Sequence, residues 1–228
     1  MDEQPLVVTL DGPAGSGKTT VAKLVAAQLG IAYLDSGAMF RGLAYVLGEN
    51  SWDWPEKRLQ SVLSELSFEL VGRSAEAELL LNGRPLGEDI RQENVGMWAS
   101  HLAKIKLVRE HLKAAQQMLG AQRSLVAEGR DMGTVIFPRA KHKFFLEARP
   151  EERAKRRFRQ LQEMGVAADL LELTENLHLR DEQDRNRALA PLKPAEDAVI
   201  VDTTGMNANQ VAETIIARVL ADGTVAHA

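Results

Sequence analysis

The sequence of 228 residues contains no cysteine. This absence excludes disulfide bonds, thiolate metal sites and a cysteine nucleophile, and it is typical of cytoplasmic proteins. No apolar run approaches the roughly 18 residues of a membrane-spanning helix, and the N-terminal stretch MDEQPL does not resemble a secretion signal. The formal net charge is −4, so the chain has no overall positive field for nucleic acid or a membrane surface. We expect a cytoplasmic protein that binds neither.

Short apolar runs separated by helical patterns dominate the chain. Hydrophobic residues make up 45% of it, which is ordinary for a globular protein, and the length suits one large domain. Five runs read as buried strands, namely PLVVTL, IAYLD, SLVAEG, HKFFLEA and DAVIVDT. Strands of this kind suit a parallel sheet that is covered on both faces. The sequence therefore predicts a doubly wound α/β fold with a five-stranded parallel sheet flanked by helices.

The region from Ser67 to Ile90 departs from this pattern. Its apolar and polar residues alternate, and Asn82-Gly83 is a typical hairpin turn. We predict a small antiparallel β insert here, followed by one long helix over residues 95–119. Two further helices are expected after the fourth strand, one starting at Pro150 and one over residues 168–188. The apolar spacing also predicts a helix over residues 18–29, closed by Gly30.

The stretch LDGPAGSGKTT lies between the first strand and this first helix. Gly12, Gly17, Lys18 and Thr19 match the pattern G-x-x-x-x-G-K-[ST]. Such a loop turns its backbone N–H groups toward phosphate oxygens at a helix N-terminus, while the lysine reaches the terminal phosphates and the hydroxyl binds Mg²⁺. The alternative is a glycine-rich turn without a ligand. We predict that a nucleoside triphosphate is bound with Mg²⁺, with Thr19 as the metal ligand, by Gly12, Pro13, Ala14, Gly15, Ser16, Gly17, Lys18, Thr19 and Thr20.

Arginines follow two of the other strands. Arg41 comes after the second strand and Arg130 after the third, at the strand ends where ligands bind in such sheets. No Asn-Lys-x-Asp element of a switch GTPase is present, and the nearest paired acids of a large ATPase are the separated Glu128 and Asp131. Arginine suits phosphate because its planar fork stays charged and binds in two places. The alternative for each is a surface salt bridge; together they favour a small phosphotransferase.

Two later clusters of charge fit the same chemistry. Arg180, Asp184 and Arg187 stand at positions i, i+4 and i+7, so on a helix they would share one face. Such a face can grip a phosphate and a sugar hydroxyl, or it can be an ordinary solvated stripe of ion pairs. The segment RAKRRFR, residues 153–159, would suit a lid that closes over the triphosphate.

These motifs together resemble the bacterial cytidylate kinase family, whose members phosphorylate CMP and dCMP. The resemblance rests on DGPAGSGKTT, YLDSGAMFR, EGRDMGTVIFP, RDEQDRNR and APLKPAEDAVIVDTT, and it covers nearly the whole chain. It implies a P-loop nucleoside monophosphate kinase fold in one domain. The core would comprise about residues 1–60, 96–150 and 189–228, the monophosphate-binding insert about residues 61–95, and the helical lid about residues 151–188.

The resemblance also assigns roles to single residues. Lys18, Arg41, Arg130 and Arg187 would be the catalytic cations, and Arg157 of the lid would join the ATP site. Ser100, Arg109 and Asp131 would read the cytosine edge; as helix residues, Ser100 and Arg109 would otherwise be ordinary surface positions. The implied (d)CMP site comprises Ser36, Arg41, Ser100, Arg109, Arg130, Asp131, Arg180, Asp184 and Arg187. One departure is Phe40, where the family usually has tyrosine, so one hydrogen bond to the acceptor is in doubt.

The implied reaction is direct in-line transfer from MgATP to CMP or dCMP, without a covalent enzyme intermediate, by a monomeric protein. Three other functions remain as alternatives at this point. They are a kinase of another acceptor such as AMP, UMP, dTMP or shikimate, a nucleotide-dependent switch that hydrolyses ATP slowly, and an RNA-binding protein that uses RAKRRFRQ. The last lacks stacking aromatics and positive net charge.

Overall fold

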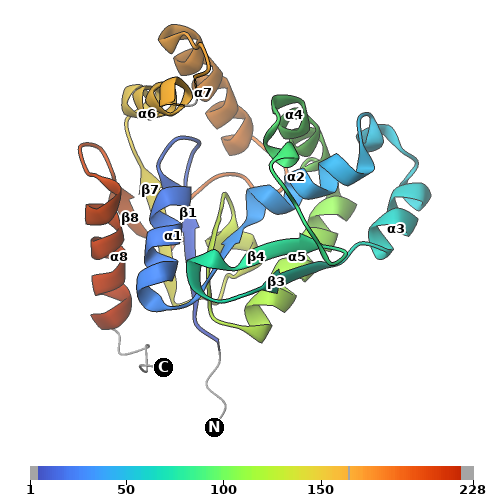
Figure 1. The fold of residues 1–228 in the computed structure, drawn as a ribbon, viewed down its shortest axis with the longest axis horizontal. Helices are drawn as coiled ribbons and strands as arrows, with labels where there is room; N and C mark the ends of the chain where they lie inside the picture. The colour runs from blue at the N-terminus through green and yellow to red at the C-terminus, as the bar shows by residue number, and fades with distance from the viewer. Residues whose placement is uncertain (1–4, 164, 222–228) are drawn as a thin grey trace.

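A parallel β-sheet forms the centre of the molecule in the computed structural model, which describes residues 5–163 and 165–221. Its strands are β1 (Val7–Asp11), β2 (Ala32–Asp35), β6 (Leu125–Gly129), β7 (His142–Glu147) and β8 (Val199–Asp202). They lie in the order β2-β6-β1-β7-β8, and every neighbouring pair is parallel. The five predicted strands and the doubly wound sheet are confirmed (Figure 1).

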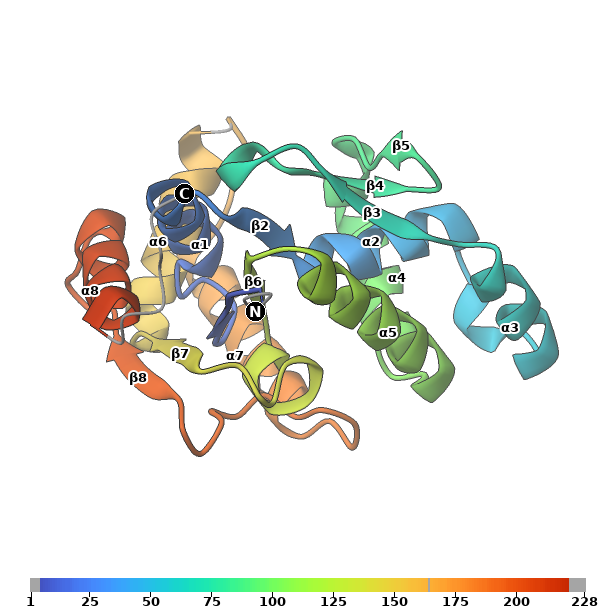
Figure 2. The ribbon, with the colours of Figure 1, turned by 90° about the horizontal axis from the view of Figure 1, so that it is seen from below.

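Helices cover both faces of this sheet, because successive side chains along a strand point to opposite faces. On β6, Leu125 and Ala127 join an apolar cluster with α2 (Ser36–Leu47), α3 (Glu56–Ser64), α4 (Glu93–Leu102) and α5 (Lys106–Gln122). Val126, between them, joins a second cluster with α1 (Lys18–Leu29) and α8 (Ala208–Ala221). Figure 2 shows α1 and α8 side by side, away from α5. The predicted bounds of α1 are confirmed, and Gly30 closes it in a left-handed conformation (φ 66°).

The predicted antiparallel insert is also confirmed. Strands β3 (Phe68–Val71), β4 (Glu78–Leu81) and β5 (Arg84–Pro85) form a three-stranded sheet that crosses in front of the core in Figure 1. Asn82 and Gly83 both have positive φ, 50° and 71°, as a tight hairpin turn requires. The short 3₁₀ turn Ser74–Glu76 packs against α1 and β2, so the insert rests on the core beside the end of β2.

The long helix predicted over residues 95–119 is wrong, because the chain leaves the helical conformation between α4 and α5. Ile105 is extended (φ −89°, ψ 121°), and its carbonyl oxygen accepts the first hydrogen bond of α5, from the Arg109 N–H. Leu102 and Val108 are fully buried on either side of this break. The break lets both apolar faces reach the core, and no glycine or proline in the sequence marks it.

Helices α6 (Pro150–Glu163) and α7 (Leu170–Arg185) pack against each other and stand above the sheet in Figure 1. Both predicted helices are confirmed, although α7 is shorter than predicted because Asp169 caps its start and it ends at Arg185. Since all five strands are parallel, their carboxyl ends meet at one edge, below these two helices. Within the described residues, no helix combines the length and apolar character needed to span a bilayer.

Candidate active site at the carboxyl ends of the strands

The phosphate loop, residues 12–17, joins β1 to α1 at this edge. Gly12 has a φ of 148°, and a Cβ there would lie 2.2 Å from the carbonyl oxygen of Leu146, so only glycine fits. The buried Lys18 Nζ donates to the Pro13 carbonyl oxygen at 2.6 Å and lies 3.3 Å from Ser16 Oγ. Burial, and next the charge of Arg130, lowers the pKa of Lys18 to about 7. The negative charge of a polyphosphate bound in the loop would stabilise the protonated, charged form of Lys18.

A buried carboxyl group lies beside the start of α1. Glu128 on β6 pairs in register with Asp35 on β2, and it accepts hydrogen bonds from the Tyr33 hydroxyl and from Thr19. Burial, and then the neighbouring charge of Asp35, raises the pKa of Glu128. Among the described residues no group of three or more acidic or histidine side chains could hold a metal on its own. A hydroxyl and a carboxyl group beside the phosphate loop suit Mg²⁺, which keeps waters and binds substrate phosphates.

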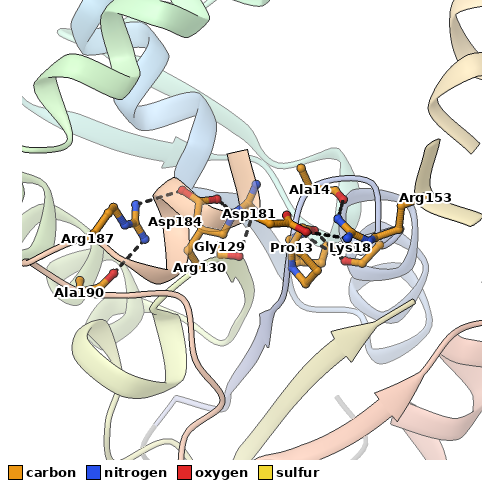
Figure 3. Close-up of polar contacts among 11 residues, drawn as sticks. Pro13, Ala14, Lys18, Gly129, Arg130, Arg153, Asp181, Asp184, Arg187 and Ala190 are labelled. Atoms are coloured by element: carbon orange, nitrogen blue, oxygen red, sulfur yellow. Dashed lines mark hydrogen bonds and ion pairs between the residues drawn. The ribbon is translucent and has the colours of Figure 1, made fainter. Parts of the chain in front are cut away.

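Arginines from two segments converge on Asp184 of α7 (Figure 3). Arg130 Nε donates to Asp184 Oδ2 at 2.8 Å, and Arg187 Nη1 lies 3.7 Å from Asp184 Oδ1. Burial acts to raise the pKa of Asp184, but Arg130 and Arg187 together hold it below its ordinary value. Arg187 lies beyond the end of α7, so the predicted helical face is incomplete. Its Nη2 donates to the Ala190 carbonyl oxygen at 2.8 Å, and this contact keeps the guanidinium beside Asp184.

Further cations lie within electrostatic reach of this group. The pKa of Arg41 on α2 is lowered, first by burial and then by Arg91, Arg130 and Arg157, against the attraction of Asp35. The pKa of Arg180 on α7 is lowered by desolvation and by repulsion from Arg130, Arg41 and Arg157. Guanidinium groups that repel one another in this way are stabilised by an added anion, and phosphate matches their geometry.

A second ion pair lies next to the arginine group, which comprises Arg41, Arg130, Arg180 and Arg187. Asp131, which follows Arg130 after β6, is buried and pairs with Arg109 of α5. Burial raises the pKa of Asp131, against the pull of Arg109 and Arg187. The Arg109 guanidinium also lies over the Phe40 ring, 5.7 Å from its centroid, and 3.4 Å from the carbonyl oxygen of Ala103 at the helix break. A carboxylate beside a guanidinium presents an acceptor next to donors, which is a complement to one edge of a nucleobase.

The predicted substrate residues differ in how closely they are grouped. Ser36 begins α2 against Gly129, where a Cβ would lie 2.7 Å from Ser36 Oγ. Ser100 is exposed on α4, one turn before the helix break. Arg157 is exposed on α6, and its Nη1 donates to Gln160 Oε1 at 2.8 Å rather than to the phosphate loop. The residues that form one electrostatic group are Arg41, Arg109, Arg130, Asp131, Arg180, Asp184 and Arg187, and Arg157 acts on this group by repelling Arg41 and Arg180.

Sequence reasoning missed the arginines that touch the phosphate loop. The buried Arg153 donates to the Ala14 carbonyl oxygen at 3.0 Å and to Asp181 Oδ2 of α7 at 2.5 Å (Figure 3). Arg156 Nη2 donates to the Thr203 carbonyl oxygen at 2.6 Å, and its Nη1 lies 3.4 Å from that of Ser16. The cluster RAKRRFR was a signal for such contacts. All three arginines lie on α6, and the orientation of this helix decides that Arg153 and Arg156, and not Arg157, contact the phosphate loop.

A phosphate loop beside a cluster of arginines from other segments of the chain defines a P-loop phosphotransferase. A family model described as cytidylate kinase matches residues 8–221. Curated cytidylate kinases are similar over most of their length. The cytidylate kinase of Maridesulfovibrio salexigens is 56% identical over 94% of this chain and 96% of its own chain. That of Nitratidesulfovibrio vulgaris is 58% identical over 90% of this chain and 88% of its own chain. A cytidylate kinase from Oleidesulfovibrio alaskensis is 51% identical over 93% and 97%. The chain belongs to the cytidylate kinase family.

Proposed function

We propose that this protein transfers the terminal phosphoryl group of ATP to CMP and dCMP, forming ADP and CDP or dCDP. The observation that carries the proposal is the position of the Asp131–Arg109 pair, beside the arginine group and on the same sheet edge as the phosphate loop. A phosphate donor, a phosphate acceptor and a nucleobase thus have separate, adjacent places. Membership of the cytidylate kinase family supports the choice of base.

The donor side consists of residues 12–20 with help from the lid. The backbone N–H groups of the phosphate loop and the start of α1 surround the ATP phosphates, and Lys18 binds the transferring group. Arg157 reaches this group when α6 moves toward it. Thr19 and Glu128 would hold Mg²⁺, which neutralises phosphate charge when bound. The acceptor phosphate is already an anion at neutral pH, so the transfer needs no general base on the protein.

The acceptor side consists of the arginine group and the Asp131–Arg109 pair. Arg41, Arg130 and Arg187 hold the phosphate of CMP, with Ser36 beside them, while Arg180 and Asp184 contact the sugar. Asp131 accepts from the cytosine amine, whereas Arg109 and Ser100 donate to the acceptor atoms N3 and O2. UMP would set a carbonyl oxygen against the Asp131 carboxylate and leave that group without a donor, which discriminates strongly in a buried site.

The proposed function also implies how the chain is divided into core, insert and lid, and in which compartment the protein acts. The core comprises about residues 1–60, 96–150 and 189–228, the monophosphate-binding insert about 61–95 and the lid about 151–188, of which residues 1–4, 164 and 222–228 lie outside the described residues. The direct in-line transfer belongs to pyrimidine nucleotide metabolism, and the protein acts as a cytoplasmic monomer. The absence of cysteine supports the location.

Identification of the products tests the proposed reaction. The protein is incubated with MgATP and CMP, and ADP and CDP are quantified by ion-exchange chromatography. We expect the two products in equal amounts, and a loss of at least about 100-fold in rate for Arg130→Met, since the guanidinium contacts the acceptor phosphate. Arg139→Met changes an exposed arginine near the same segment and should keep the wild-type rate. ADP without CDP would contradict the proposal.

A further inference from the structure

Asp11, the last residue of β1, makes contacts that neither substrate requires. Its side chain is 4% exposed, and its Oδ1 accepts the backbone N–H of Met132 at 2.9 Å while its Oδ2 accepts that of Gly133 at 2.7 Å. In parallel register Asp11 lies opposite Gly129 of the neighbouring strand β6. A carboxylate immediately before the phosphate loop therefore holds the segment that follows β6.

These two N–H groups begin an unusual turn. Residues Met132–Ile136 form a single π-helical turn, in which the Val135 and Ile136 N–H groups both donate to the Asp131 carbonyl oxygen, at 2.9 and 3.2 Å. The first N–H groups of any helical turn lack partners within it. Here the Asp131 side chain does not cap the turn, because it points instead to Arg109. Asp11 supplies the two acceptors, and Asp131 remains available at the head of the turn.

The turn sits very close to Asp11. A Cβ on Gly133 would lie 3.1 Å from Thr9 Oγ1 and 3.4 Å from Asp11 Oδ2, so the absence of a side chain at this position permits the approach. A one-residue shift of the turn would change the direction of the Asp131 carboxylate, because Asp131 directly precedes the turn. Arg130 precedes it directly and donates to Asp184.

Stability alone does not favour this carboxylate. Burial opposes its negative charge, and the charge of Asp131 adds to that opposition, while the Met132 and Gly133 N–H groups and Lys18 favour it. A buried carboxyl group beside a second one is an expensive way to satisfy two amides. Buried carboxylates with satisfied hydrogen bonds make the surrounding backbone rigid, and they are found where the protein needs one fixed geometry.

We propose that Asp11 is a positioning residue for base recognition, because its two hydrogen bonds fix the π turn that directs Asp131 toward the pyrimidine. The inference rests on the proposed phosphorylation of CMP and adds to it a residue that touches neither substrate. It also connects the two halves of the reaction. The carboxylate that orients the acceptor site is covalently joined to Gly12, the first residue of the phosphate loop.

Asp11→Asn tests this role with almost no change in shape. The amide retains one acceptor but sets an NH₂ group against the second backbone N–H, so the turn loses one of its two anchors. We expect kcat/KM for CMP to fall roughly 10- to 100-fold, as for small misplacements of a recognition group. The KM for ATP should stay within about 2-fold, and the ratio of kcat/KM for CMP over UMP should fall at least about 10-fold.

Gln117→Met is the matched control. Gln117 Nε2 donates to the Ile136 carbonyl oxygen at 2.8 Å, at the far end of the same turn, so its loss loosens the segment without releasing Asp131. This variant should keep the wild-type ratio of CMP to UMP. An Asp11→Asn variant that loses activity equally toward CMP and UMP would have a structural role only, and the inference would be overturned. A wild-type protein inactive on CMP would instead overturn the proposed function.

An amide measurement on the wild type covers the case in which Asp11→Asn does not fold. Hydrogen exchange of the Met132 and Gly133 amides is followed without ligands, which requires no activity. A turn fixed in advance by Asp11 predicts that both amides exchange at least about 100-fold more slowly than exposed ones. Exchange at the rate of exposed amides before CMP is added would overturn the inference.

Discussion

The buried ion pair between Arg153 of α6 and Asp181 of α7 should contribute strongly to stability. Its side chains are 3% and 9% exposed, and Arg153 also donates to the carbonyl oxygens of Ala14 and Ala148, at 3.0 and 3.1 Å. Asp181→Asn leaves the guanidinium buried with those neutral partners only. Removal of one member of a buried pair destabilises a protein by about 3–5 kcal/mol. For a chain of this size that corresponds to a fall in Tm of roughly 6–20 °C.

Thermal denaturation followed by circular dichroism measures this effect, and a double variant separates its parts. In Arg153→Met/Asp181→Leu no uncompensated charge remains, although two carbonyl oxygens lose a donor at about 1 kcal/mol each. We therefore expect the double variant to be more stable than Asp181→Asn. Glu152→Gln, which breaks an exposed pair with Lys155 on the same helix, should leave the Tm unchanged. A Tm loss under about 3 °C for Asp181→Asn, or a double variant less stable than the single one, would refute the reasoning.

Three further predictions follow from the same contacts. Burial raises the pKa of Asp11 from 3.8 to about 6, so the folded state binds the extra proton and stability falls as the pH rises through that range. Urea denaturation at several pH values should show this loss, up to about 3 kcal/mol in total, in the wild type and not in Asp11→Asn, and parallel curves of stability against pH would contradict it. A Cβ at Gly12 would overlap the Leu146 carbonyl oxygen, so Gly12→Ala should abolish ATP binding in calorimetry, and wild-type affinity would show that the loop tolerates the side chain. Asp131→Asn should lower kcat/KM for CMP at least about 100-fold and that for UMP much less, as measured by coupled assay, and equal losses would remove Asp131 from base recognition.

The core of the fold follows from patterns that the sequence carries locally. The apolar run around Val126 is typical of a strand that is covered on both faces of the sheet, as β6 is. Gly30 marks the end of α1 because a residue in the left-handed conformation is needed there. The phosphate loop is visible in the sequence because its glycines and lysine stand at a fixed spacing, although the contact that requires Gly12 is with Leu146 of β7. In contrast, the break at Ile105 depends on how two apolar faces meet the core, and no residue within it signals a helix end.

The site was predictable where a residue's chemistry identifies it and unpredictable where orientation decides. The sequence predicts Arg130 and Asp184 each as a site residue, and in the structure the two are in contact. Nothing in RAKRRFR separates Arg153, which donates to a carbonyl oxygen of the phosphate loop, from Arg157, which donates to Gln160 of its own helix. In the sequence, Asp11 is recognisable only as the last residue of a strand. Its role is not visible there, because its partners are backbone N–H groups about 120 residues away and backbone groups have no sequence signature.

The acceptor specificity of the reaction tests the central claim most directly. ADP formation from MgATP is measured with CMP, dCMP, UMP, AMP or no acceptor, one at a time, at equal concentrations. We predict fast turnover with CMP and dCMP, weak turnover with UMP and background turnover with AMP. If CMP left the rate at the background without acceptor, the assignment of the arginine group and of Asp131 to a cytidine monophosphate would be contradicted.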